Sequence, residues 1–339
     1  MTAVSKKMSK QQRHEYKIRW QTVDGMRLAQ EVFHRLAAGK ALHDLKMSEH
    51  NNRVDLRGIF APQASKEKMA PFRNWSLQKL SGQLTFKNVH FEGIDFSGAQ
   101  LANLRFFNSK ITNCCFDYAQ CEDWRLWATD VSHTTFVDAD LYSAVLGPWY
   151  EGRGNMYESV SFYKADMSKL NSPAATFRDC DFSHAKLQEI DFESSSFIRC
   201  RFAGELREVI FWDHGFKTGK PDPNPMEDVD FSQARLRWVE FRRLNLDRVR
   251  FPEDEDHLLI NNYRCVLHKV LAALKDNESN HARRLRAILE LKLKWIGPQQ
   301  QVGVVCRRDF GERWGMSGEK FAVDLLRRAE QECAKSSIN

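Results

Sequence analysis

Cysteine and histidine have the widest chemical repertoire of the side chains in this sequence, but their spacing does not form a catalytic or metal site. There are eight cysteines and eleven histidines. Cys114, Cys115 and Cys121 lie close together with a spacing that matches no metal signature, and the histidines are scattered. No glycine-rich phosphate-binding loop or nucleophile elbow occurs, and the Gly-Arg-Gly stretch at 152–154 is long enough only for a turn. We therefore expect no catalytic activity, no cofactor and no metal.

Aromatic and arginine side chains outside the regular pattern described below are better candidates, and their chemistry is protein recognition. Trp, Tyr and Arg often dominate the binding energy of protein interfaces. Many of them occur in two irregular segments, 147–159 and 212–228, which we expect to project as loops. The candidates are Trp149, Tyr150, Arg153, Tyr157, Trp212, Arg235, Arg237, Arg242 and Arg243. An equally good interpretation is that both segments are tolerated surface insertions, since the entropy cost of closing a loop grows slowly with its length.

The regular pattern is an apolar residue at every fifth position. It begins at Phe86 and continues without a slip to Leu146. The period matches neither a helix nor a strand, which indicates a repeat structure. A second small or medium residue lies two positions before each of these apolar residues, so two side chains in every five are predicted to point inward. The chain should turn a corner at each repeat and bury a narrow central column.

Residues that are twenty apart share a chemical character, which indicates that four repeats close one coil. Phe96, Phe116 and Phe136 form one such series, and Leu101, Cys121 and Leu141 form another. Coils joined by strand-like hydrogen bonds would lie about 4.8 Å apart. Four cysteines fall on inward positions, so we expect them to be small core residues in a reducing compartment: Cys114, Cys121, Cys180 and Cys200.

Several units resemble the consensus of the pentapeptide-repeat family, which is Ala, then Asp or Asn, then Leu, then two variable positions. The clearest are Ala139-Asp140-Leu141, Ala165-Asp166-Met167, Cys180-Asp181-Phe182, Ile190-Asp191-Phe192 and Val229-Asp230-Phe231. The resemblance implies a mainly β solenoid, a right-handed quadrilateral β-helix. It also implies a protein without intrinsic catalysis. The best-known members are quinolone-resistance proteins, which resemble a B-DNA duplex and bind type II topoisomerases in its place.

The repeats divide the chain into three regions. Phased blocks run from Phe86 to Leu146, from Phe162 to Phe202 and from Phe231 to Phe251, which predicts about seven coils within residues 84–255. The step from Phe202 to Phe211 is one residue short of two repeats, so a distortion is expected near Gly204. Residues 1–83 are predicted to form a helical or irregular cap, and residues 256–339 a helical region.

Helical patterns occupy both flanks. One runs from Trp20 to Leu36, and three C-terminal patterns cover 258–274, 285–296 and 321–329. Residues 54–56, Val-Asp-Leu, resemble a stray repeat unit and should touch the open end of the coil. The C-terminal helices could cap the last coil, dimerise or form a separate binding module, and the cap is the preferred interpretation because a bare terminal coil exposes apolar side chains and unpaired backbone.

Charge is distributed unevenly along the chain. The formal net charge is +9 for residues 1–83, −8 for residues 84–255 and +5 for residues 256–339. An acidic rod is therefore predicted to lie between two basic ends. No apolar stretch approaches the length of a membrane span and no signal peptide is apparent, so we expect a cytoplasmic protein that does not enter a membrane.

Two functions fit these observations. The first is a non-catalytic scaffold that presents a rigid acidic surface and helical ends to a protein partner. The alternative is a DNA-mimicking modulator of a type II topoisomerase such as gyrase. Asp95, Asp130 and Asp140 are not separated by multiples of twenty, so they do not form a continuous phosphate-like stripe, and the scaffold is preferred. Homodimers or head-to-tail assembly through the basic ends stay open, whereas direct nucleic-acid binding is not expected.

Overall fold

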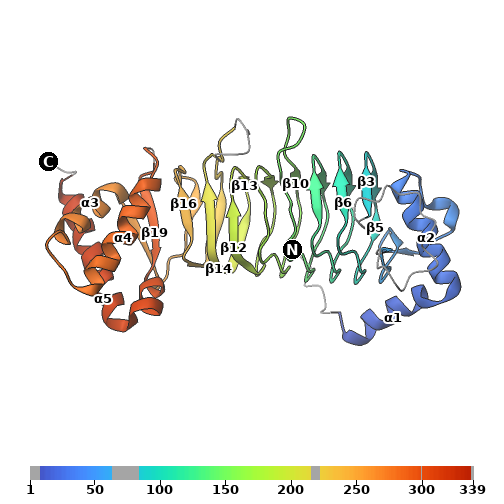
Figure 1. The fold of residues 1–339 in the computed structure, drawn as a ribbon, viewed down its shortest axis with the longest axis horizontal. Coiled ribbons are helices and arrows are strands. Elements are labelled where there is room, and N and C mark those ends of the chain that lie inside the picture. Colours follow the sequence, from blue (N-terminus) through green and yellow to red (C-terminus); the bar gives the residue numbers. More distant parts are fainter. Residues whose placement is uncertain (1–7, 63–83, 215–221, 299, 337–339) are drawn as a thin grey trace.

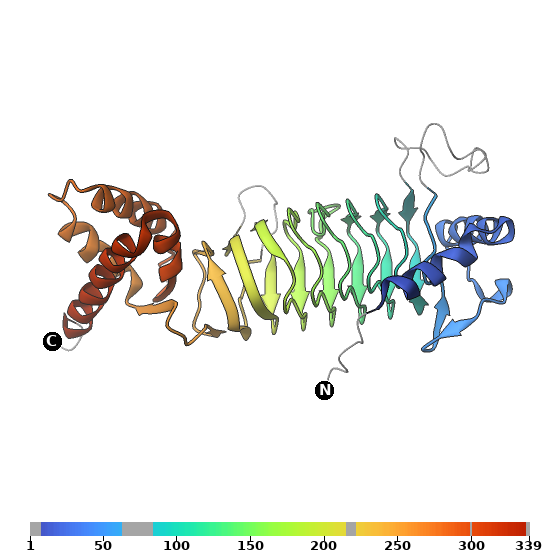
Figure 2. The same ribbon diagram turned by 90° about the horizontal axis from the view of Figure 1, so that it is seen from below.

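The protein is a long stack of parallel strands with helices at both ends (Figures 1 and 2). The computed structural model describes residues 8–62, 84–214, 222–298 and 300–336. Within the stack, each turn of the chain pairs in parallel with the next. Most partners are twenty residues apart, as in the series Phe86, Phe106 and Leu126. The period predicted from the sequence is therefore the register of the stack.

Four parallel ladders run along the stack. The first contains β3 (Thr85–Lys87), β6 (Arg105–Phe107) and β8 (Arg125–Trp127), and it continues through single bridges to β12 (Leu187–Phe192), β14 (Arg201–Trp212) and β16 (Glu240–Arg242). The second contains β4 (His90–Glu92), β7 (Lys110–Thr112), β9 (Asp130–Ser132), β10 (Met156–Glu158), β11 (Thr176–Arg178) and β13 (Ser196–Ile198).

The third ladder begins with β2 (Arg53–Asp55) and β5 (Ile94–Asp95), and ends with β14, β15 (Val229–Arg237) and β17 (Val249–Arg250). The fourth joins single residues such as Gln100, Gln120 and Asp140. The 54–56 unit thus supplies the first rung of the third ladder, where Leu56 is fully buried.

Left-handed corner residues explain how five residues make one side. Consecutive corners at Asn103, Asn108 and Asn113 have φ of 64°, 48° and 51°, and the pattern recurs at five-residue intervals along the stack. Asn and Asp tolerate this conformation better than most residues because their short polar side chains bond locally. At each such corner the backbone turns from one side of the coil to the next.

The core is a set of stacked side chains inside the four ladders. Phe96, Phe116 and Phe136 stack with ring centroids 5.0 Å apart, and Phe182 stacks on Phe202 at 4.7 Å. The four cysteines predicted to be core residues are buried free thiols, and burial raises the pKa of Cys114 to about 12. The expected distortion near Gly204 is present: the register of β14 shifts between Arg201 and Ala203, and Gly204 has φ of 82°.

The N-terminal end of the stack is covered by α2 (Val23–Ala37), which follows α1 (Lys10–Gln21) and precedes a short 3-10 helix (His43–Leu45) and β1 (Glu49–His50). The buried face of α2 contributes Val32, Phe33 and Leu36 to the stack's own core. Arg19 ties α1 to the first rung through Asp55, with Nη2 2.6 Å from Oδ1.

The C-terminal unit contains more than the predicted helices. It begins with β18 (His257–Asn261), which pairs antiparallel with β19 (Val302–Cys306). The prediction of one helix over 258–274 is wrong at its start, because residues 258–261 form this strand; α3 (Tyr263–Ala273) begins only after Asn262. The remaining helices are α4 (Asn280–Trp295) and α5 (Arg307–Ser336), and α5 is kinked at Gly315, where φ is 69°.

A disulfide joins Cys265 of α3 to Cys333 of α5. It lies in a separate apolar core that these helices share. This disulfide disagrees with the expectation of a reducing compartment. That expectation was based on the inward cysteines of the repeats, and Cys265 and Cys333 lie outside the repeat pattern. Among the described residues, no helix is both long and apolar enough to cross a membrane.

Candidate partner-binding surface

The segment 147–159 forms a small hairpin at its centre. Tyr150 and Arg153 exchange backbone hydrogen bonds, with the Tyr150 amide donating at 2.8 Å and the Arg153 amide at 3.1 Å. Gly152 supplies the left-handed turn, with φ of 83°. The hairpin rises from the stack just before β10 (Figure 1), and it is the part of the segment 147–159 that projects.

An aromatic cluster lies beneath this hairpin on the outer face of the first ladder. Phe107 and Trp127 are stacked almost parallel, with centroids 4.4 Å apart and an interplanar angle of 4°. Tyr150 meets the edge of Phe107 at 5.8 Å, and the Lys87 ammonium lies 5.6 Å from the Phe107 centroid. The outer aromatic cluster (Phe107, Trp127 and Tyr150) is half-buried, and Trp149 beside it is half-buried too.

Polar contacts hold the hairpin against the stack. Arg153 forms an ion pair with Asp130 at 2.7 Å and also donates to the carbonyl of Ala128. Asn108 donates to Glu151 at 3.1 Å, and a hydrogen bond with Glu151 raises the pKa of Tyr150. The hairpin is thus fixed across the corner between the first two ladders, and Arg153 is an anchor as well as a surface residue.

The last part of the segment belongs to the stack, so the expectation that Tyr157 projects is wrong. Tyr157 is 1% exposed, stacks on Phe177 at 4.9 Å and donates its hydroxyl hydrogen to the carbonyl of Leu146 at 2.7 Å. It takes the inward position between Val131 and Phe177 in the second ladder. The hairpin therefore adds six residues to one turn, after which the register resumes.

Asn155 is the residue that allows this insertion. It is 1% exposed, its Nδ2 donates to the carbonyls of Leu126 and Leu146, and its Oδ1 accepts from the Thr129 amide at 2.9 Å. These bonds pair backbone groups that the insertion would otherwise leave without partners.

We expect Asn155→Ala to lower the free energy of unfolding by about 2 to 3 kcal/mol, because it leaves buried backbone groups without partners. Urea denaturation checks this. The matched control is Met156→Ala, whose side chain is 42% exposed and which should change stability by less than about 0.5 kcal/mol. Equal effects of the two substitutions would contradict this role of Asn155.

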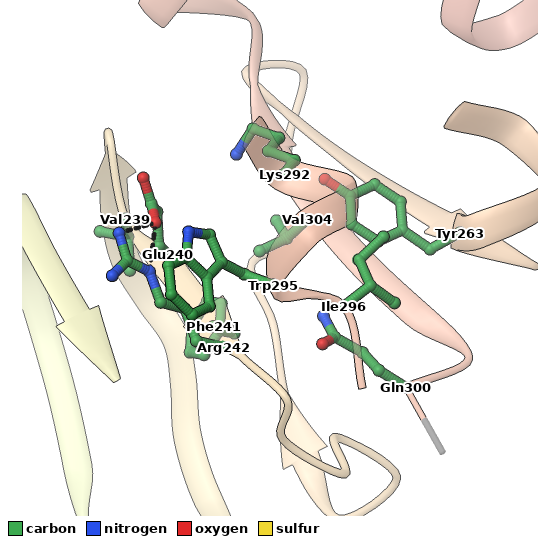
Figure 3. A pocket seen from close by; sticks show the side chains of 11 residues that line it. Val239, Glu240, Phe241, Arg242, Tyr263, Lys292, Trp295, Ile296, Gln300 and Val304 are labelled. Atoms are coloured by element: carbon green, nitrogen blue, oxygen red, sulfur yellow. Dashed lines mark hydrogen bonds and ion pairs between the residues drawn. The ribbon is translucent and has the colours of Figure 1, made fainter. Parts of the chain in front are cut away.

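Trp212 and Arg242 do not form a free surface either, which corrects the expectation that they bind a partner. Trp212 is the last residue of β14 and is 6% exposed; it donates to Asp191 at 2.7 Å and packs edge-on against Trp295 of α4 at 5.1 Å. Arg242 lies near both indoles, with Cζ 4.4 Å from the Trp212 centroid and 4.8 Å from that of Trp295. Its guanidinium also contacts Glu240 (Figure 3).

The segment 212–228 likewise returns to the stack before its predicted end. Asn224 is buried and accepts from the Phe197 amide, and Glu227 bridges to Ile198. The central residues of this predicted loop, 215–221, lie outside the described residues.

Arg237 and Arg243 also serve the attachment of the C-terminal unit. Arg237 contacts Asp309 at 3.0 Å and Glu312 at 2.7 Å, both at the start of α5. Burial raises the pKa of Asp309, although the Trp238 amide and Arg237 act in the opposite direction. The Arg243 amide donates to the carbonyl of Trp295 at 2.8 Å. Arg235 differs, because its side chain is 68% exposed and lies 4.0 Å from Glu205.

The cavity beside Trp295 is too small for a substrate. It measures about 30 Å³, close to one water molecule, and is lined by Tyr263, Lys292 and Gln300 among others (Figure 3). Within the described residues there is no group of three or more His, Cys, Asp or Glu side chains that could hold a metal ion.

The structure therefore separates the predicted site residues into three groups. Trp149, Tyr150, Arg153 and Arg235 lie on the surface, and Tyr157 lies in the core of the stack. The other four attach the C-terminal unit: Trp212, Arg237, Arg242 and Arg243. Phe107 and Trp127 were missed by the sequence interpretation. Their signal was present: they are aromatic, twenty apart, and each directly follows an inward residue, so each must point outward.

Comparisons with known proteins agree with the repeat pattern. The family description for pentapeptide repeats (eight copies) matches residues 175–204. HetL, a pentapeptide repeat protein involved in heterocyst differentiation regulation from the cyanobacterium Nostoc, is similar at 15% identity over 50% of this chain and 90% of its own, with a TM-score of 0.24. QnrB1, a plasmid-mediated fluoroquinolone resistance protein, is similar at 14% identity over 55% of this chain and 91% of its own, with a TM-score of 0.21. A search of curated proteins finds no match.

Proposed function

We propose that this chain, which matches the pentapeptide-repeat family over residues 175–204, is a non-catalytic scaffold that presents one rigid surface to a protein partner. The frame would be a right-handed quadrilateral β-helix of about seven coils over residues 84–255, with residues 1–83 and 256–339 as its caps. The single observation that carries the proposal is the outer aromatic cluster, held on a regular wall by a pinned hairpin.

The cluster has the properties of a binding hot spot. Its rings are already ordered by stacking, so a partner would lose little conformational entropy in covering them. Aromatic side chains with neighbouring cations are enriched at interface centres. Lys87, Arg105 and Arg125 lie on the same outer wall, and the two arginines share the carboxylate of Asp123. Lys87 is the exposed cation beside the cluster, 5.6 Å from the Phe107 centroid, and it would favour a partner with an acidic group at that point.

We expect Trp127→Ala to weaken partner binding by about 2 kcal/mol or more, roughly thirty-fold in Kd. The measurement is a titration of the isolated partner by surface plasmon resonance. Tyr142→Ala is the matched control, because Tyr142 is an outward aromatic that is 41% exposed on another wall. If both variants bind like the wild type, the partner does not use this cluster.

The topoisomerase alternative requires carboxylates that face solvent as phosphates do. Many carboxylates on the stack are instead neutralised by cations on the neighbouring rung. Asp179 pairs with Arg199 at 2.7 Å, Asp228 with Arg248 at 2.6 Å and Asp230 with Arg250 at 2.9 Å, each twenty residues apart. These pairs disfavour a DNA mimic. Inhibition of gyrase supercoiling by micromolar protein would reverse this preference.

A further inference from the structure

A cavity of about 280 Å³ lies between the end of the stack and the C-terminal helices. Its walls come from β14, the start of β16, α4 and α5, and it includes Ile210, Trp238 and Leu291. Leu291 is 50% exposed, which is unusual for a large apolar side chain next to a hollow. The volume is close to the lower end of small-molecule sites, so a ligand of about a dozen heavy atoms would fill it.

Charged residues of opposite sign line this cavity from its two sides. The strand side carries the carboxylates of Glu208 and Glu240, and the helix side carries Lys292 and Arg313. Arg242 holds Glu240 in place at 2.6 Å, and Arg313 lies 4.1 Å from the ring centroid of Trp238. Two of the four charged groups are therefore already oriented by contacts within the protein.

The smaller cavity shown in Figure 3 adjoins this one, since both are lined by Glu240 and Lys292. It contains Gln300, which is 5% exposed, and the Oε1 atom of Gln300 is buried without a hydrogen-bond partner among the described residues. A buried acceptor of this kind is costly unless a donor reaches it. A water molecule in this smaller cavity would supply the donor.

We propose that the larger cavity binds a small zwitterion with an apolar side chain, namely a free α-amino acid of about the size of leucine or phenylalanine. The ammonium group would face Glu208 and Glu240, and the carboxylate would face Lys292 and Arg313. A ligand with both charges could pair with both sides of the cavity, where Glu240 and Lys292 are half-buried, whereas a ligand with one charge could pair with only one side. Bound there, the ligand would bridge α4 to the stack, a role independent of the outer aromatic cluster.

The test is isothermal titration of the full chain with L-leucine and L-phenylalanine, together with their N-acetyl and amide derivatives. Saturable binding at millimolar concentration or below is expected for the free amino acids, and blocking either charged end should weaken it at least about tenfold. Lys292→Ala and Glu208→Gln should each weaken binding by about the same factor. Arg284→Ala and Glu205→Gln, which change exposed residues on the same elements outside the cavity, should not.

The absence of saturable binding by the folded wild-type chain would overturn the proposal. Equal binding of the blocked derivatives, or unchanged binding by Lys292→Ala, would overturn it as well. Circular dichroism and thermal melts of the ligand-free variants establish that each is folded, so that a lost signal reports the site itself.

Discussion

Phe106→Ala should lower the free energy of unfolding by about 3 to 5 kcal/mol, whereas Phe107→Ala, at the next residue, should cost less than about 1.5 kcal/mol. Phe106 is fully buried and stacks on Phe86 at 5.0 Å, with Trp124 at 5.3 Å. Removing its ring opens a cavity in the central column of side chains. The hydrogen-bonded ladders around this column hold the backbone in place. Phe107 points outward on the same strand, and its removal costs its contacts with Trp127, Tyr150 and Lys87.

Guanidinium denaturation of the two variants measures this difference. The comparison is well controlled, because the same side chain is removed from adjacent positions of β6. A similar loss of unfolding free energy in both variants would mean that the outer stack of Phe107 and Trp127 stabilises the fold as much as the inner column does. It would contradict the division into a core and a recognition surface.

Asp309→Ala should loosen the C-terminal unit by about 3 kcal/mol. Asp309 is 7% exposed and accepts hydrogen bonds from Arg237 and from the Trp238 amide, each at 3.0 Å. Its removal leaves the partly buried Arg237 guanidinium with Glu312 and the Arg308 carbonyl as hydrogen-bond partners. Hydrogen exchange in β18, β19 and α5 should accelerate by roughly two orders of magnitude, while exchange in β6 to β8 stays unchanged.

The control for this substitution is Arg235→Ala. Arg235 lies on the same strand two residues before Arg237, and its exposed contact with Glu205 is long. We expect a change below about 0.5 kcal/mol. Uniform acceleration of exchange throughout the chain in Asp309→Ala would show global destabilisation, and would contradict a local attachment role.

The repeat core was predictable because its signal is strictly periodic. Each inward position, such as Phe96, Phe116 and Phe136, repeats the same environment, so one pattern specifies many contacts. The stray repeat unit at 54–56 was expected only to touch the open end of the coil, and it in fact pairs with β5 as the first rung of the third ladder. The helices were predictable as elements because their apolar residues follow the helical period.

The ends of the two insertions follow the same period, but the sequence interpretation missed them. Tyr157 lies five residues before Phe162, and Met226 lies five residues before Phe231, so both take inward positions and both are buried. Asn224 lies two residues before Met226, at the second inward position, and is buried too. The strand β18 was misread for a different reason: Leu258 and Leu259 continue a helical apolar pattern, and only pairing with β19 decides otherwise.

The binding role assigned to the arginines was wrong for a physical reason. Arginines such as Arg237 and Arg242 are typical of protein interfaces, and both do lie at an interface. The surface that they contact is this chain's own C-terminal unit and not a separate protein. Sequence alone does not distinguish an internal interface from an external one. Cys265 and Cys333 are 68 residues apart in the sequence and form a disulfide within the C-terminal unit. Sequence alone did not show this pairing either, because it depends on how α3 and α5 pack together.

The most direct test of the scaffold proposal is site-specific photocrosslinking in extracts of the native cell. A photoreactive phenylalanine analogue replaces Trp127 in one version of the full chain and Tyr142 in another. We expect a discrete protein adduct from position 127 and none from position 142. No adduct from position 127, with the protein folded, would contradict the claim that this wall is the recognition surface.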